Sequence, residues 1–169
     1  MRAALPDPAV LPRLPVYRAL NPVYARDPLS GAGAALHGGR FNRKGRAALY
    51  TALTPVGAVN EANQAGRPFE PVVLVAYDGQ VGPCLDACDP TQLAAVGLAP
   101  ADLAAPDWRL VMAAQGITPL QAACERLIAL GYHGMIAPSY AEGAHSARNL
   151  VLWRWEGLSA IDHEGRLSR

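Results

Sequence analysis

Apolar residues in this chain come in short runs separated by turn-forming residues, and this pattern restricts the fold more than any other feature. The first run, at residues 16–20, has Pro15 before it and Asn21-Pro22 after it, and both are residues that end strands. The run at residues 72–77 is continuously apolar and rich in β-branched residues, which predicts a buried strand. The pattern predicts short strands at residues 16–20, 48–51, 72–77, 135–137 and 150–155.

Two Thr-Pro pairs mark helix starts, because threonine caps the first free N–H groups and proline has no N–H to leave unpaired. Thr54-Pro55 predicts a helix that runs to Ala65 and stops at Gly66.

Thr118-Pro119 predicts the second helix, in which Gln121 completes a capping box and Gly131 ends the helix. Residues 79–107 are turn-rich, and only residues 91–96 predict a short helix there. The apolar stripe expected on the second helix consists of Leu120, Ala123, Cys124, Leu127 and Ile128.

These elements predict an α+β fold, a compact single domain with short mixed or antiparallel strands and a few helices. The length of 169 residues fits one domain. We expect an N-terminal extension at residues 1–15, the domain itself at residues 16–156 and a C-terminal surface tail at residues 157–169.

Charge and hydropathy exclude several classes of function. The net charge is +1 without a run of like charge, whereas nucleic-acid binding needs clustered basic residues. No stretch is apolar and long enough to span a membrane, and residues 1–15 lack the apolar run of a signal peptide. We therefore expect a cytoplasmic protein that binds neither nucleic acid nor membrane directly.

The three cysteines, Cys84, Cys88 and Cys124, form no disulfide framework, and reduced thiols are the simpler interpretation. Cys84 and Cys88 have a spacing at which they could meet on a helical turn, but no further metal ligands accompany them. We expect no metal site.

Residues 30–40 are rich in glycine and are expected to form a loop. The segment lacks the Gly-Lys-Ser/Thr of a phosphate-binding P-loop. Its Gly31-x-Gly33 pair is not expected to lead into a helix, so the segment is not a dinucleotide fingerprint of the Rossmann type.

The next segment contains a more informative group of residues: Gly38-Gly39-Arg40-Phe41-Asn42, then Tyr50, then Glu61. Helical spacing places Glu61 at the border of the apolar face of its helix, beside the small residues Gly57, Ala58 and Ala65. Small neighbours leave space for a ligand over the carboxylate. A solvated surface glutamate is the alternative interpretation.

Taken together, these stretches resemble the RES domain, the toxin component of bacterial toxin–antitoxin systems whose antitoxins are of the Xre type. The resemblance extends from about Val16 to Trp155, and its strongest part is the Gly-Gly-Arg-aromatic-Asn block with the following Tyr and Glu. The matching stretches are Tyr17-Arg18, Gly33-Ala34, Gly38 to Asn42, Leu49-Tyr50, Glu61, Gly134, Pro138-Ser139 and Asn149 to Leu152.

The resemblance implies a fold like that of ADP-ribosyltransferases and an enzyme that cleaves NAD+ as its substrate, with no prosthetic group. In that reaction positive charge develops on the ribose, as in glycoside hydrolysis. Glu61 would bind the ribose hydroxyls and stabilise this charge, Arg40 or Arg18 would bind the pyrophosphate, and Tyr50 would face the nicotinamide ring.

Ser139 is expected to hydrogen-bond the carboxamide or the ribose, and Asn149 is expected to do the same or to hold the loop. The segment between them is longer than the family pattern and contains a second candidate, Ser146, so which serine faces the substrate stays open. Phe41 also replaces the usual Trp of the family. Tyr24 and His37 lie near the matching segments, and Asn42 is expected to support its loop.

Three functions follow as alternatives. The first is hydrolysis or phosphorolysis of free NAD+, which depletes the cell of NAD+. The second is ADP-ribosylation of a protein, and the third is a binding module without turnover. For the toxin, the resemblance also implies an Xre-family antitoxin that covers the NAD+ cleft.

Overall fold

The computed structural model describes residues 6–63, 70–141, 143 and 146–168, and its framework is one seven-stranded sheet. The strands lie in the order β4-β5-β6-β2-β1-β3-β7, and every neighbouring pair is antiparallel except β4 and β5. Their bounds are Val16–Leu20 (β1), Leu49–Ala52 (β2), Val73–Gly79 (β3), Cys84–Asp86 (β4), Gly134–Pro138 (β5), Arg148–Leu152 (β6) and Leu158–Ala160 (β7). The predicted α+β class is confirmed.

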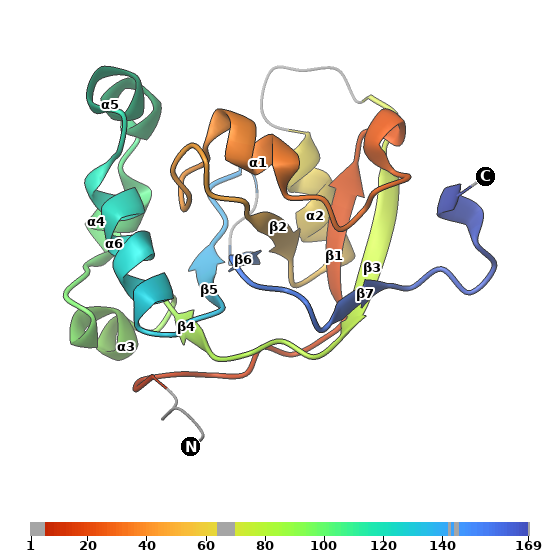
Figure 1. The fold of residues 1–169 in the computed structure, drawn as a ribbon. Helices are drawn as coiled ribbons and strands as arrows, with labels where there is room; N and C mark the ends of the chain where they lie inside the picture. Colours follow the sequence, from red (N-terminus) through yellow and green to blue (C-terminus); the bar gives the residue numbers. More distant parts are fainter. Residues whose placement is uncertain (1–5, 64–69, 142, 144–145, 169) are drawn as a thin grey trace.

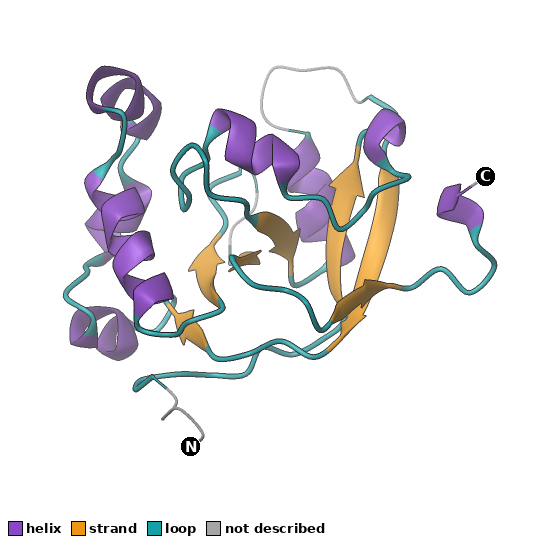
Figure 2. Ribbon diagram, in the orientation of Figure 1, coloured by secondary structure: helices purple, strands orange, loops and turns teal. Residues whose placement is uncertain are grey.

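Six α-helices accompany the sheet in the described part of the chain. Helices α3 to α6 form a layer beside the β4–β5 end of the sheet, whereas α1 and α2 lie near its centre (Figures 1 and 2). Their bounds are Ala32–His37 (α1), Pro55–Ala62 (α2), Pro90–Ala95 (α3), Pro100–Ala104 (α4), Trp108–Gln115 (α5) and Pro119–Ala129 (α6). Short 3-10 helices span Pro22–Tyr24 and Arg166–Ser168.

The two Thr-Pro helix starts are confirmed. Thr54 accepts a hydrogen bond from the N–H of Gly57, and Thr118 forms the expected capping box with Gln121. Helix α2 ends at Ala62, earlier than expected, and the predicted stop at Gly66 lies outside the described residues. The stripe predicted for α6 is buried.

The glycine-rich segment is not a loop throughout, because residues 32–37 form helix α1. Alanine is the best helix former, and two interactions from outside the helix hold its last carbonyls. Asn42 Nδ2 donates to the carbonyl of Ala34 at 2.8 Å, and the N–H of Gly45 donates to that of Ala35 at 2.8 Å. The sequence pattern did not predict this helix, because the residues that hold its carbonyls lie in the turn that follows it.

Helices α4 and α5 and strand β4 lie in or just after the stretch expected to be mostly turns. Helix α4 is five residues long, too short to show a helical period. On α5 only Trp108 is buried, so this helix has no apolar stripe by which to recognise it.

The strand predicted at residues 72–77 exists, but it is buried on one face only. Val75 and Tyr77 are buried, whereas Leu74 is 45% exposed. β3 lies next to the edge strand β7, where one face of the sheet meets solvent. The apolar run therefore predicted the strand correctly and its burial on both faces wrongly.

Strand β7 lies within the segment expected to be a surface tail and pairs with β3 through Tyr77 and Ala160. At the other end of the chain, Val10 pairs with Cys84, and the Tyr132 hydroxyl donates to the carbonyl of Pro8 at 2.5 Å. Both terminal segments thus contact the body of the fold.

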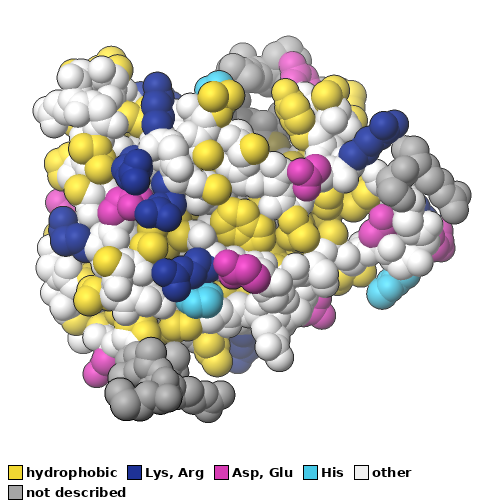
Figure 3. All heavy atoms as spheres, viewed as in Figure 1, with side chains coloured by type: hydrophobic (Ala, Val, Ile, Leu, Met, Phe, Trp, Pro, Cys, Tyr) yellow, Lys and Arg dark blue, Asp and Glu magenta, His cyan; other side chains and the backbone are white. Residues whose placement is uncertain are grey.

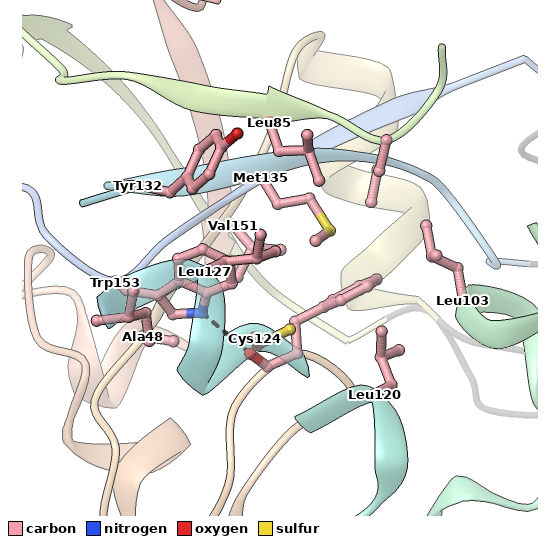
Figure 4. Close-up of a cluster of buried hydrophobic side chains, with 14 of the residues drawn as sticks. Ala48, Leu85, Leu103, Leu120, Cys124, Leu127, Tyr132, Met135, Val151 and Trp153 are labelled. Carbon is pink, nitrogen blue, oxygen red and sulfur yellow. Dashed lines mark hydrogen bonds between the residues drawn. The ribbon is translucent and has the colours of Figure 1, made fainter. Parts of the chain in front are cut away.

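The core has two parts on opposite faces of the sheet, because successive residues of a strand point to opposite sides. In β5, Met135 and Ala137 belong to one cluster and Ile136 to the other. The first cluster packs under α6 and contains Trp153, whose indole N–H donates to the carbonyl of Phe41 at 3.0 Å (Figure 4). This bond anchors the segment that carries Arg40 to the core.

Candidate active site

Glu61 lies in the last turn of α2 and is the centre of a polar cluster. Its Oε1 accepts hydrogen bonds from the Ser139 hydroxyl and from Asn149 Nδ2, the latter at 2.6 Å. Two donors on one oxygen fix the orientation of the carboxylate and leave Oε2 available to a ligand. The solvated-glutamate interpretation does not describe this residue.

The sheet register brings the two donors together. β5 and β6 are antiparallel, with Ala137 opposite Asn149 and Pro138 opposite Arg148. Ser139 follows β5 directly, and its N–H donates to the carbonyl of Ala147 at 2.9 Å. Ser139 and Asn149 therefore emerge side by side at one end of this strand pair.

Asn149 Oδ1 is the one buried side-chain oxygen or nitrogen without a hydrogen-bond partner in the described part of the chain. An unpaired buried polar atom carries a cost of about 1–3 kcal/mol. Asn149 uses its amide group as a donor to Glu61, so its free atom is an acceptor.

Arg40 lies in a tight turn that closes with a bridge between Gly39 and Asn42. Gly39 has no room for a side chain, because a Cβ there would overlap the Tyr50 hydroxyl. The Tyr50 hydroxyl accepts from the N–H of Phe41 at 3.1 Å and donates to Asn42 Oδ1 at 2.7 Å. Burial raises the pKa of the Tyr50 phenol, which keeps this donor protonated.

Tyr50 thus supports the turn through its hydroxyl, while its side chain lines the site. Asn42 is 1% exposed and donates to the carbonyls of Ala34 and Arg46 at 2.8 Å each. Asn42 therefore supports the loop, as predicted.

The Arg40 side chain is held by backbone carbonyls and aromatic rings. Its Nη1 donates to the carbonyls of Leu103 at 2.8 Å and Ala105 at 2.9 Å. The guanidinium lies 4.5 Å from the centroid of the Tyr140 ring and 5.8 Å from that of Trp108. Burial lowers its pKa, with Tyr140 opposing the shift, but an arginine remains charged.

Arg40 and Glu61 line the same cavity of about 350 Å³, which we call the Arg40 cavity. A second cavity of about 280 Å³, here the Arg18 cavity, lies next to it. Tyr50, Glu61 and Asn149 line both, so this trio is shared by the cavities of the two arginines. A larger hollow of about 480 Å³, among α4 to α6, also touches Arg40 but not Glu61.

Arg18 lies in β1 and lines the Arg18 cavity, which Arg40 does not line. Its Nη1 donates to the carbonyl of Ser30 at 3.1 Å and, more weakly, to that of Pro28 at 3.4 Å. The structure therefore brings each candidate arginine into a cavity that the trio also lines.

Ser139 donates a hydrogen bond to Glu61, whereas Ser146 is exposed in the following loop. Neither serine lines the Arg40 or the Arg18 cavity itself. Tyr24 and His37 line a separate hollow beyond Arg18, and neither contacts Glu61.

Sequence reasoning missed three residues that line the Arg40 cavity, Trp108, Arg109 and Tyr140. Tyr140 follows Ser139 directly, and this adjacency was the only signal for it. Trp108 and Arg109 lie on α5, which the sequence pattern did not reveal.

Cys84 and Cys88 are not on a helical turn but on β4 and the turn after it. Burial raises the pKa of the Cys84 thiol to about 12. Within the residues that the structure describes, no three His, Cys, Asp or Glu side chains gather as a metal site would require.

Comparisons with known proteins define the class of this fold and site. The RES domain matches residues 15–168, and the chain belongs to this family. The chain is also similar to a solved structure from M. tuberculosis, the MbcT-MbcA toxin-antitoxin complex, with 25% sequence identity and a TM-score of 0.68. That similarity covers 91% of this chain and 84% of the other.

No curated protein sequence matches the chain significantly. No helix in the described ranges has the length and apolar character that a membrane span requires.

Proposed function

We propose that this protein is the toxin of a toxin–antitoxin system and that it cleaves NAD+ at the bond between nicotinamide and ribose. The observation that carries the proposal is the cavity shared by Glu61 and Arg40, in which Ser139 and Asn149 orient the carboxylate. Membership of the RES family and the similarity to a toxin–antitoxin complex support the toxin assignment.

The chemistry of the two ends of the Arg40 cavity fits a dinucleotide. At one end, Glu61 Oε2 offers a negative charge and an acceptor, so the ligand there has hydroxyl or amide donors or positive charge. At the other end, Arg40 offers charge and N–H donors, so the ligand there is an anion. NAD+ combines a ribose and a cationic nicotinamide with a pyrophosphate.

Glu61 accounts for bond cleavage in this proposal. As the bond breaks, nicotinamide leaves with the bonding electron pair, and positive charge spreads over C1′ and the ring oxygen of the ribose. The fixed carboxylate accepts a hydrogen bond from a ribose hydroxyl, and it stabilises the positive charge on the ribose without having to reorient. An acceptor oxygen then attacks C1′ and loses its proton to solvent.

Product analysis tests the proposal. The purified chain is incubated with NAD+, with and without inorganic phosphate, and the products are identified by mass. Free ADP-ribose indicates hydrolysis, a phosphorylated ADP-ribose indicates phosphorolysis, and ADP-ribose on a protein indicates the transferase alternative. If no nicotinamide is released, the proposal is wrong and the module without turnover is favoured.

Glu61→Gln tests the assignment of the site. The change is nearly isosteric, so the fold is retained, but Gln places an amide where the ribose needs an acceptor. We expect NAD+ loss to be abolished, with Glu164→Gln as a control because Glu164 is exposed and pairs with Arg166. Consumption of NAD+ by Glu61→Gln at the wild-type rate would falsify the assignment.

The proposal includes an antitoxin partner of the Xre family that covers the NAD+ cleft, and it places the toxin in the cytoplasm. The test compares the purified chain with its complex with the protein encoded by the neighbouring gene. We expect the complex to consume less NAD+ than the free chain. Equal turnover in the two samples would refute occlusion of the site.

A further inference from the structure

Arg109 is a second guanidinium in the Arg40 cavity, and the functional assignments above leave it without a role. It lies in the first turn of α5, and its side chain is supported by Trp108, whose ring centroid is 4.4 Å away. Trp108 therefore contacts both guanidiniums that line this cavity.

Neither guanidinium of the cavity has a carboxylate partner among the described residues, although other arginines do. Arg46 and Arg43 pair with Glu125, the first of them at 2.7 Å. Basic and acidic side chains accordingly lie side by side near α6 on the face in Figure 3. Carboxylates thus neutralise the positive charge of the Arg40 cavity less than they neutralise the positive charge of Arg43 and Arg46.

Two positive charges close together in a cavity repel each other, and the pKa of Arg40 registers this repulsion. After burial, the charge of Arg109 is the other cause that lowers this pKa; Tyr140 opposes the lowering more strongly than Arg109 contributes to it, and Tyr50 and Glu61 oppose it more weakly. A doubly charged anion between the two guanidiniums turns the repulsion into attraction on both sides. The hydrogen bonds of Arg40 to backbone carbonyls use Nη1, so its other nitrogens remain available to such an anion.

We propose that Arg109 and Arg40 together form the anion subsite of the cavity and that it takes the diphosphate group of the dinucleotide. The Arg40 guanidinium is held by carbonyls at the end of α4, whereas Arg109 is carried by the first turn of α5. The identity of the ligand rests on the proposed function, whereas the pairing of the two guanidiniums does not. A free phosphate ion has the same charge chemistry and is the alternative source.

Calorimetric titrations with ADP, adenosine and inorganic phosphate test the subsite without measuring turnover. ADP contains the diphosphate and adenosine lacks it. The variant is Arg109→Gln, which keeps a long polar side chain and removes the charge. Arg154→Gln is the matched control, because Arg154 is exposed and lines neither the Arg40 nor the Arg18 cavity.

We expect Arg109→Gln to weaken ADP binding about tenfold, in line with one charge-assisted hydrogen bond, and to leave adenosine binding unchanged. Arg109→Lys restores part of the loss, since it restores the charge without the planar fork. In turnover assays, the KM for NAD+ rises and kcat is retained.

Unchanged ADP binding in Arg109→Gln, or an equal loss for ADP and adenosine, overturns the subsite. If Arg109→Gln weakens the binding of inorganic phosphate but not of ADP, the site binds a free phosphate ion, and the proposal that it binds a diphosphate group is overturned. Either result leaves the proposed function intact, because NAD+ cleavage by the wild-type chain is measured separately through nicotinamide release.

Discussion

Gln121 links helix α6 to the turn that presents Arg40, and its replacement by leucine tests that link. The side chain is fully buried. Its Nε2 donates to the carbonyls of Gly39 at 2.7 Å and Asn42 at 3.1 Å, and its Oε1 accepts from the N–H of Thr118 at 2.9 Å. Gln121→Leu keeps a similar volume and removes these three hydrogen bonds, together with a fourth, weaker one from Nε2 to Met112 Sδ at 3.2 Å.

The expected loss follows from which groups are left unpaired. The carbonyls of Gly39 and Asn42 each keep one partner, because the backbone N–H of the other residue donates to them. Losing the hydrogen bond from Gln121 therefore costs about 0.5–1.5 kcal/mol of stability at each carbonyl, the usual net value of a hydrogen bond. The N–H of Thr118 has no other acceptor among the described residues, and leaving it buried and unpaired costs about 1–3 kcal/mol. We expect a total loss of roughly 2–6 kcal/mol in the free energy of unfolding.

Urea denaturation, followed by circular dichroism, measures this loss. Gln115→Leu is the control, because Gln115 is exposed at the end of α5 and its replacement is expected to change stability by at most about 0.5 kcal/mol. A loss below about 1 kcal/mol for Gln121→Leu would refute the hydrogen-bond accounting. It would mean that water or a shifted loop satisfies these groups.

Two further predictions concern charged residues. Arg40→Ala is expected to weaken NAD+ binding by roughly 1.5–3 kcal/mol, the value of a charge-assisted contact, and unchanged affinity by calorimetry would remove Arg40 from the site. Glu125 has its pKa lowered, first by the hydrogen bond from Arg46, so its stabilising contribution is present at neutral pH and is lost as the pH falls through that lowered value. The pair is partly exposed, so wild type should exceed Glu125→Gln by at most about 1 kcal/mol at pH 7. In acid denaturation series this difference should begin to fall near pH 4.3, the ordinary pKa of a glutamate, and vanish below the lowered pKa of Glu125. A difference that is constant with pH would contradict the assignment.

Local signals in the sequence predicted the elements that depend on few neighbours. The helix starts at Thr54 and Thr118 were predicted correctly, because a cap is made within three residues of the chain. Helix α1 was missed because its carbonyls are held by Asn42 and Gly45, which follow the helix. Helix α5 was missed because it buries only one residue.

The same distinction holds for the site. The sequence determined which groups are present, a Gly-Gly-Arg turn, a tyrosine, a glutamate and two serines, and the order of these groups indicated the family. It could not determine that Ser139 rather than Ser146 meets Glu61, because that contact spans 78 positions and depends on the register between β5 and β6. Arg109 entered the cavity only through the packing of the helical layer against the sheet. Residue types and caps are properties of the chain itself, whereas convergence of distant side chains is a property of strand register and packing, which only the tertiary structure decides.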